Sequence, residues 1–322
     1  MTTAIICTHN PRTDVIGRCI GALRKQRVEP GRAELLVVDN DSDVPLDAVQ
    51  LGLGDFPYPA RLIQEPRLGL TEARRTGLRH ARGDVVVFVD DDNFLGEDYL
   101  RVTDEVMASH PEWGGLGGRN LPLTDDPLPG WMDDELLRAL VVRDLGPEPK
   151  RFLEDHTPYG AGMVVRREPA LGILSGTFLM SDRIGTRLSS GGDSELCYRL
   201  RIQGWPLWYE PRLVLHHYLE PRRLTPAYME RLHAGFGEDR MGIELFWYRG
   251  TWLRRLSYIR RSLGHALRGR RLTREAGVEP TTMAGVKARC GAAFSRSFSR
   301  ALFRAAFGPA VWRDVPHLDP RR

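Results

Sequence analysis

The chain has 322 residues, of which 42% are hydrophobic and 27% are charged, so it can bury a full core and is neither disordered nor fibrous. No apolar run reaches the ~18–20 residues that a membrane-spanning helix needs, and we expect no secretory signal at the start. The four cysteines show no C-x-x-C pairing, which argues against a disulfide scaffold or a zinc cage. We therefore expect a cytoplasmic protein.

The small positive charge conceals an uneven distribution. The chain contains 46 Lys and Arg against 42 Asp and Glu, a net charge of +4. Residues 1–250 hold 30 basic and 38 acidic residues, a balance of −8, whereas residues 251–322 hold 16 and 4, a balance of +12. A difference of this size predicts that residues 251–322 have a different function from residues 1–250.

The first 120 residues alternate short apolar runs with amphipathic stretches. Short, mostly apolar runs predict strands at residues 4–7, 34–39, 60–64 and 84–89, and the run at 34–39 has the β-branched, apolar composition of a buried parallel strand. The spacing of apolar residues predicts helices at 15–23 and 70–81. Strands that alternate with helices are typical of a parallel α/β sheet.

Fewer elements are predicted farther along the chain. Residues 120–165 are rich in Pro, Asp and Gly and predict loops, with a strand expected at 159–167 and a helix at 194–203. Beyond residue 250, two helical stripes are apolar: Trp252, Leu256, Ile259, Leu263 and Leu267, then Phe294, Phe298 and Leu302. Gly264 lies inside the first stripe and argues against an unbroken helix.

Polar residues follow three of the predicted strands. They are Thr8-His9-Asn10, Asp39-Asn40-Asp41-Ser42 and Asp90-Asp91-Asp92. Ligands of an open parallel sheet bind beyond the carboxyl ends of its strands. The three adjacent carboxylates repel one another, and a divalent cation such as Mg²⁺ or Mn²⁺ would relieve that repulsion. A solvated acidic turn ahead of the next helix is the alternative interpretation.

The glycine-rich phosphate loops of common nucleotide-binding proteins are absent from the sequence. It has neither G-x-G-x-x-G after the first strand nor G-x-x-x-x-G-K-[ST] anywhere, which argues against dinucleotide oxidoreductases and P-loop enzymes. Asp193 follows two glycines at a predicted helix start, where it is either a general base or a helix N-cap. His216 and His217 are adjacent, so only one of them can face a given site.

Five motifs, in the same order, resemble those of the family-2 glycosyltransferases, which have the GT-A fold. They are residues 5–12, 34–42, 69–77, 83–92 and 193–199, and the resemblance covers about residues 3–240. It implies an α/β fold with a Rossmann-like, mostly parallel sheet flanked by helices. The catalytic domain would span 1–245, with the nucleotide-sugar half at 1–120 and the acceptor half at 121–245, followed by a basic helical extension at 246–322.

The resemblance implies a metal-dependent, inverting transfer of a sugar from a nucleoside-diphosphate sugar to an acceptor hydroxyl. The donor-binding residues that it implies are Thr8, Asn10, Asp39, Arg74, Asp90, Asp91 and Arg222, with Arg223 as an alternative to Arg222. Asp90, Asp92 and His217 would bind Mg²⁺ or Mn²⁺, and Asp193 would be the general base. A sugar-1-phosphate nucleotidyltransferase-like enzyme and an inactive scaffold of the same fold are the alternatives.

The sequence departs from the family pattern at a few positions. His9 replaces a usual Tyr, Gly192 replaces a Glu, and Arg75 replaces a common Asn, which would add a charge close to the bound phosphates. The segment 158–163 resembles a stretch that lines the sugar site, and a glycine turn entering a core strand is the alternative. Trp131, Trp205 and Trp208 are candidates either for stacking on sugars or for packing.

The basic segment is compatible with several partners. It would bind an anionic membrane surface through residues 251–310, pack on the catalytic domain or form a dimer contact, and we do not expect nucleic acid as a partner. The expected localisation is the cytoplasm, with peripheral contact at the inner face of the plasma membrane under the first interpretation. The sequence does not identify the donor nucleotide, the acceptor (a glycan, a glycolipid or another hydroxyl compound) or the oligomeric state.

Overall fold

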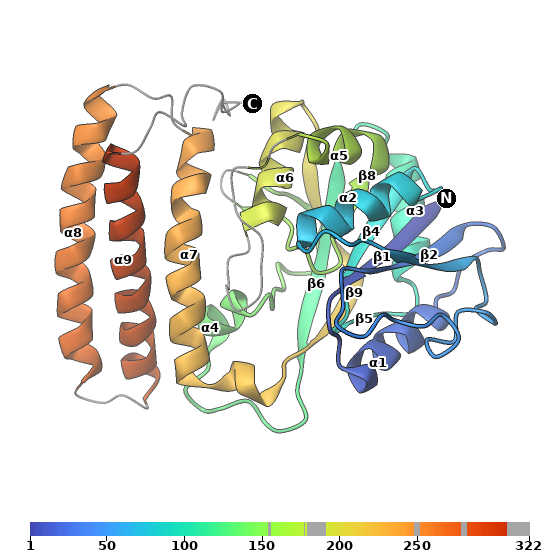
Figure 1. The fold of residues 1–322 in the computed structure, drawn as a ribbon, viewed down its shortest axis with the longest axis horizontal. Coiled ribbons are helices and arrows are strands. Elements are labelled where there is room, and N and C mark those ends of the chain that lie inside the picture. The colour runs from blue at the N-terminus through green and yellow to red at the C-terminus, as the bar shows by residue number, and fades with distance from the viewer. Residues whose placement is uncertain (154–155, 177, 179–190, 248–251, 278–281, 308–322) are drawn as a thin grey trace. The chain divides into compact units, whose positions relative to one another are not determined.

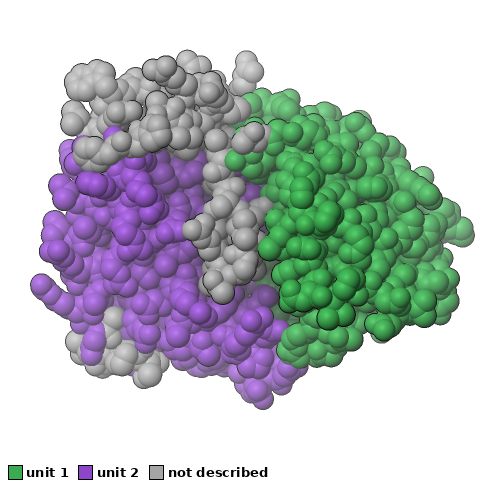
Figure 2. All heavy atoms as spheres, viewed as in Figure 1, with its two compact units in different colours: residues 1–123, 141–178, 196–218 green, residues 124–140, 179–195, 219–322 purple. Residues whose placement is uncertain are grey.

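The computed structural model of the chain describes all residues except 154–155, 177, 179–190, 248–251, 278–281 and 308–322 (Figure 1). The chain divides into two compact units, shown in two colours in Figure 2. The first unit comprises residues 1–123, 141–178 and 196–218, and the second comprises 124–140, 179–195 and 219–322. The functional boundary predicted at residue 245 remains a prediction.

The first unit is built on a mixed β-sheet. Its strands are β1 (Thr2–Thr8), β2 (Ala33–Asp39), β3 (Ala60–Gln64), β4 (Val85–Asp90), β5 (Asn93–Leu95), β6 (Gly115–Leu123), β7 (Lys150–Arg151), β8 (Val164–Arg166) and β9 (Leu207–Tyr218). They pair in the order β3-β2-β1-β4-β8-β6-β9-β5, with β7 beside β9. The pairs among β3, β2, β1 and β4 are parallel, as predicted. Beyond β4 the sheet is mixed, since β8 is antiparallel to both of its neighbours and β6 is parallel to β9.

Helices cover both faces of this sheet. They are α1 (Thr13–Arg24), α2 (Leu70–His80), α3 (Tyr99–Ser109), α5 (Arg167–Leu174) and α6 (Gly191–Ile202). The first five residues of α6, 191–195, belong to the second unit. Alternate residues of β1 serve the two faces: Ala4 and Ile6 pack with α1 and α3, whereas Ile5 and Cys7 pack with α2, α5 and α6. Strands buried on both faces have continuous apolar sequences, which is why β1, β2 and β4 were predictable.

The second unit contains a group of long helices. Its elements are α4 (Asp134–Ala139), the 3-10 helix η1 (Pro221–Leu224), α7 (Pro226–Trp247), α8 (Trp252–Ala276) and α9 (Met283–Phe307). Helix α9 packs between α7 and α8 (Figure 1). Around Met241, Tyr258, Phe298 and Leu302 these three helices share a small apolar core. Gly264 does not interrupt α8, so the predicted break there was wrong.

Two further expectations meet the structure in part. The segment 120–165 is mostly loop, as predicted, but it also holds the end of β6, helix α4 and strand β7. The strand expected at 159–167 is shorter, because a turn occupies residues 160–162 and β8 begins at Val164. No described helix is long and apolar enough to cross a membrane.

Candidate functional site

Three of the predicted polar strand ends meet at one edge of the sheet. In the parallel register of β1 and β2, Thr8 lies beside Asp39, and on the other side of β1 Cys7 lies beside Asp90. The carboxyl ends of these strands therefore bring residues from three motifs together. This is the edge at which open α/β sheets bind ligands.

Asp39 at the end of β2 is a buried carboxylate that holds the following loop. Its Oδ2 atom accepts a hydrogen bond from the backbone N–H of Leu46 at 2.9 Å, and its Oδ1 atom accepts one from Ser42 at 3.3 Å. Burial opposes ionisation of Asp39, but these donors outweigh it, so the pKa of the carboxyl lies below its ordinary value of 3.8. Asp39 is therefore a stable anion at neutral pH.

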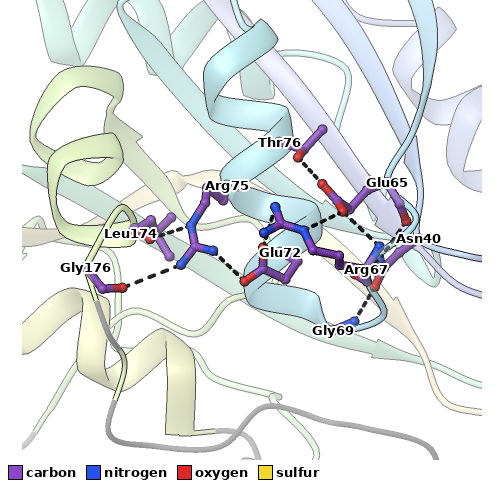
Figure 3. Close-up of polar contacts among 9 residues, drawn as sticks. All are labelled: Asn40, Glu65, Arg67, Gly69, Glu72, Arg75, Thr76, Leu174 and Gly176. Carbon is purple, nitrogen blue, oxygen red and sulfur yellow. Dashed lines mark hydrogen bonds and ion pairs between the residues drawn. The ribbon is translucent and has the colours of Figure 1, made fainter.

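The next residue, Asn40, fastens the loop between β3 and α2 (Figure 3). Its Nδ2 group donates to the carbonyl oxygens of Glu65 at 3.2 Å and Arg67 at 2.7 Å, and its Oδ1 atom accepts from the N–H of Gly69 at 2.8 Å. Asn40 is only 4% exposed. These three bonds fix the entry to α2, the helix that carries Arg74, and sequence reasoning did not single this residue out.

Glu65 and its neighbours continue this network along α2 (Figure 3). Burial opposes ionisation of Glu65, but the Thr76 hydroxyl and the N–H groups of Arg67 outweigh it, and the pKa lies below its ordinary value of 4.5. Arg67 also pairs with Glu72 at 2.8 Å. Glu65 is a buried carboxylate that could not be selected from the sequence, because its partners come from α2 and from the loop before it.

The guanidinium of Arg75 is held by contacts with its own helix, α2, and with α5. Its guanidinium pairs with Glu72, and its Nε group donates to the carbonyl oxygen of Leu174 at 2.6 Å at the end of α5 (Figure 3). Only 14% of its side chain is exposed. Arg75 therefore joins two helices, and the expectation that its charge lies close to bound phosphates stays a prediction.

Arg74, one position earlier, is also buried, with 4% of its surface exposed. Its guanidinium lies 5.0 Å from the centre of the Phe88 ring in β4. The guanidinium of Arg74 thus packs against β4, the strand that ends at Asp90. The predicted contact of Arg74 with the nucleotide stays a prediction.

Thr8 and Asn10 hold the turn after β1. The Thr8 hydroxyl donates to Oδ2 of Asp91. Asn10 has a left-handed backbone with a φ of 49°, and its side chain exchanges hydrogen bonds with Asp43, donating at 3.0 Å and accepting at 2.9 Å. Both residues connect polar segments at the carboxyl edge, as their motifs suggested.

Asp92 and His217 come together at the same edge. The Nε2 atom of His217 lies 3.5 Å from Oδ2 of Asp92, and both residues are at least nine-tenths buried. The backbone supports the approach, because the N–H of Tyr218 donates to the carbonyl oxygen of Asp92 at 2.9 Å. His216 is exposed instead, so the structure brings His217 to Asp92 and leaves His216 outside.

Asn93 orients the Asp92 carboxylate. Its Nδ2 group donates to Oδ1 of Asp92 at 2.9 Å, and Asn93 is the cross-strand partner of His217. Its own Oδ1 atom is buried and has no hydrogen-bond partner among the described residues. One oxygen of the Asp92 carboxylate thereby accepts the Asn93 amide, and the other lies near the His217 imidazole.

These donors fit a hard divalent cation. Carboxylate and amide oxygen atoms are ligands of Mg²⁺ and Mn²⁺, and an imidazole nitrogen can bind a transition ion such as Mn²⁺. Such ions are commonly held by one or two side chains together with substrate phosphates. Within the described part of the chain, no group of three or more His, Cys, Asp or Glu side chains is assembled as a metal site. Asp92 and His217 are therefore the two predicted metal ligands that the structure places together. Metal binding by these residues and by Asp90 stays a prediction.

Asp193 and Arg222 belong to the second unit. Asp193 lies in the first turn of α6, where a carboxylate is favourable at a helix N-terminus. Arg222 lies in η1 and pairs with Glu220, with 76% of its side chain exposed. Their predicted roles as base and diphosphate contact remain predictions.

The glycine turn and one tryptophan have structural roles. Gly162 has a φ of 71°, and its carbonyl oxygen accepts a hydrogen bond from the Tyr99 hydroxyl at 2.6 Å, so the alternative of a tight turn entering a core strand describes this segment. Trp208 stacks on Trp113 with ring centres 4.4 Å apart. It lies near the start of β9, at the end opposite His217, so stacking of Trp208 on a sugar at this edge was a wrong alternative.

Comparison with known proteins identifies related chains. The sequence model described as glycosyl transferase family 2 matches residues 3–171. The succinoglycan biosynthesis protein ExoM of Rhizobium meliloti (strain 1021) is 23% identical over 236 residues, which are 72% of each chain.

Solved structures are similar in fold at low sequence identity. GalNAc-T7, crystallised with UDP, GalNAc and Mn²⁺, matches with a TM-score of 0.50 and 13% identity over 75% of this chain. Residues 1–349 of S. aureus TarS match with a TM-score of 0.49 and 16% identity over 73% of this chain. The present chain spans 50% and 64% of those two chains, respectively. The predicted GT-A type α/β fold is confirmed.

Proposed function

Because the chain belongs to glycosyl transferase family 2 and is therefore a glycosyltransferase, we propose that it transfers a sugar from a nucleoside-diphosphate sugar to an acceptor hydroxyl with inversion at the anomeric carbon. The observation that carries this proposal is the buried Asp92–His217 pair at the carboxyl edge of the sheet. The name of the relative ExoM supports the biosynthesis of a polysaccharide as the setting.

Asp92 and His217 would hold a divalent cation, with Asp90 as a further candidate. The match to GalNAc-T7, whose structure contains UDP and Mn²⁺, supports Mn²⁺ or Mg²⁺. When bound, such an ion would supply positive charge to the oxygens of the departing diphosphate. Asn93 would keep Oδ2 of Asp92 turned toward the ion, because its amide already occupies Oδ1.

The remaining residues would bind the donor and move the proton. Asp39 is an ionised acceptor for the hydroxyl groups of a ribose, and the buried charge of Arg74 would favour the nucleotide diphosphate. Asp193 would accept the acceptor's hydroxyl proton while that oxygen bonds to the anomeric carbon and the bond to the diphosphate oxygen breaks. General-base assistance of this kind contributes ~10²–10⁴-fold to a rate.

The alternatives make different predictions. A sugar-1-phosphate nucleotidyltransferase would bind a nucleoside triphosphate and release pyrophosphate, and family membership argues against it. An inactive scaffold would bind neither donor nor metal. The presence of Asp39, Asp92 and His217 at one edge of the sheet argues against the scaffold.

A thermal-shift panel tests the proposal. The full chain is heated with UDP-, GDP-, dTDP- or CMP-linked sugars, each with Mn²⁺ or with EDTA. Ligands that bind the native state raise the melting temperature by mass action. We expect one nucleotide class to stabilise the protein only with Mn²⁺, and Asp92→Ala to abolish that effect. No stabilisation by any donor would contradict the proposal.

Activity then tests the base. With the donor identified, Asp193→Asn should keep donor binding and lose transfer, and the anomeric configuration of the product reports inversion. Transfer by Asp193→Asn at the rate of the unmodified protein would remove Asp193 from the mechanism.

A further inference from the structure

Helix α8 is the most positively charged element of the chain. Its sequence holds eight arginines and a single acidic residue, Glu275. The proposed transfer reaction uses none of these residues. The side chains of residues 252–256 lie outside the described part of the structure, so the inference concerns residues 257–275.

One face of α8 packs on α9. The hydroxyl groups of Ser262 and Ser299 donate to each other's backbone carbonyl oxygens at 2.9 Å and 2.8 Å. One turn earlier, Tyr258 is buried in the core that the helices share, and farther along Gly269 faces Ala292 and Arg296. These contacts fix which side of α8 is covered.

Ile259 of the predicted apolar stripe packs on this core, but the last two residues of the stripe do not face the interface. Leu263 is 63% exposed and Leu267 is 65% exposed. At 3.6 residues per turn, these two leucines lie on the side opposite Tyr258, Ser262 and Gly269. The leucines are therefore not part of the packing between the helices.

Arginines surround the two leucines on the outer face. Arg260, Arg270 and Arg274 are exposed and fall on the same side of the helix as Leu263 and Leu267. Within the described part of the chain, no ion pair involves any of these three arginines. Arg271, beside them, pairs with Glu275 at 3.4 Å. The outer face thus combines two exposed apolar side chains with three arginines that no described acidic residue pairs with.

We propose that this outer face of α8, formed by Arg260, Leu263, Leu267, Arg270 and Arg274, binds the surface of an anionic lipid bilayer. Leucines can enter the boundary between headgroups and acyl chains while arginines remain at the lipid phosphates. Anionic headgroups attract such arginines. The positive charge favours an anionic lipid surface over a second copy of this chain, because pairing two copies of the same face would bring like charges together.

The binding test uses the full chain and sedimentation with lipid vesicles. Vesicles of phosphatidylglycerol and phosphatidylcholine are compared with vesicles of phosphatidylcholine alone. We expect binding to the anionic vesicles only, weakened by salt. The triple variant Arg260→Gln, Arg270→Gln, Arg274→Gln should bind on the order of 100-fold more weakly, since each arginine near an anionic surface contributes roughly fivefold.

Two more variants test whether vesicle binding depends on the leucines and on where the removed charges lie in the chain. Leu263→Gln with Leu267→Gln keeps every charge and should weaken vesicle binding by about tenfold. The control Lys25→Gln, Arg79→Gln, Arg151→Gln removes the same charge at exposed positions of the first unit and should bind as the unmodified chain does. All substitutions are at exposed positions, and circular dichroism checks that each variant keeps its helices.

Three results would overturn the proposal. The first is equal partition of the unmodified chain to neutral and anionic vesicles. The second is loss of binding in the first-unit control to the same extent as in the α8 triple variant. The third is a dimer in sedimentation equilibrium that the leucine variant dissociates, because the outer face would then be covered by a second copy. Donor binding is measured in parallel, so that failure here is distinguishable from failure of the transferase proposal.

Discussion

The Nε2 atom of His217 lies 3.5 Å from the Oδ2 atom of Asp92, and two separate strands impose this approach. Asp92 lies two residues after the end of β4 and immediately before β5, and His217 is the penultimate residue of β9. The antiparallel pairing of β5 with β9 places Asn93 opposite His217, so the Asp92 carboxylate and the imidazole are set by the sheet itself. Groups carried on rigid strands are positioned more accurately than groups on loops.

The two adjacent histidines permit a matched comparison. His217→Asn removes the imidazole beside Asp92, whereas His216→Asn changes an exposed side chain on the other side of the strand. We expect His217→Asn to lower the turnover number by about 10²–10³-fold and to abolish the stabilisation by Mn²⁺ with the donor nucleotide. The reason is that the proposed metal ion at the diphosphate would lose one of its protein ligands. His216→Asn should retain both properties. Steady-state kinetics and thermal shifts measure the difference, and equal behaviour of the two variants would refute the assignment.

Asn40 should be important for stability as well as for the donor site. Asn40→Ala would leave the carbonyl oxygens of Glu65 and Arg67 and the N–H of Gly69 without their buried partner. We expect a loss of about 2–4 kcal/mol in the free energy of unfolding, because unsatisfied buried polar groups are costly. Urea denaturation measures it.

The neighbouring residue provides the control for Asn40. Asp41 is exposed with a left-handed backbone, and Asn tolerates that conformation, so Asp41→Asn should change the stability little. A loss below ~0.5 kcal/mol for Asn40→Ala would show that the loop is held by other contacts.

The sequence predicted the N-terminal half of the fold well because β1, β2 and β4 are buried on both faces. Residues such as Leu35 to Val38 form one apolar run that has no competing interpretation. Strand β6 was missed, since its glycines suggest a loop. A Cβ atom at Gly118 would lie 2.0 Å from the carbonyl oxygen of Leu213, and one at Gly115 would lie 2.2 Å from that of Val164, so close strand packing requires glycine there.

The candidate site was predictable only where motifs mark it. The residues after β1, β2 and β4 follow apolar runs, and a parallel sheet brings such ends together whatever the connections are. Asn40 and Glu65 were not predictable, because their roles depend on bonds to α2 and its entry loop. The contact of Arg75 with Leu174 was not predictable for the same reason, since Leu174 is a tertiary partner that the local pattern does not reveal.

Acidification should reveal the contribution of Asp39 to stability. Its pKa in the folded protein lies below the ordinary value of 3.8, so the ionised form is favoured by folding. That stabilisation is complete above the unfolded-state pKa and is lost as the pH falls through the lower folded-state value. Asp39→Asn should therefore be less stable than the unmodified chain by about 1–3 kcal/mol at pH 7.

The pH dependence of this difference is the measurement. Urea unfolding of both proteins between pH 7 and about pH 3 should give a constant difference above about pH 5 and a shrinking one below it. A difference that grows on acidification would mean that the pKa of Asp39 is raised by folding instead.

Gly162 should tolerate no side chain. Its φ of 71° is unfavourable for other residues, and a Cβ atom would lie 2.5 Å from Cδ2 of Leu215 and 2.6 Å from the hydroxyl of Tyr99. We expect Gly162→Ala to cost about 2–5 kcal/mol of unfolding free energy from strain and overpacking. Gly172→Ala is the matched control, because a Cβ atom there meets nothing within 4 Å inside α5 and should stabilise the helix by ~0.5–1 kcal/mol. Chemical denaturation compares the two, and a Gly162→Ala protein as stable as the unmodified chain would mean that the turn ahead of β8 has a different backbone.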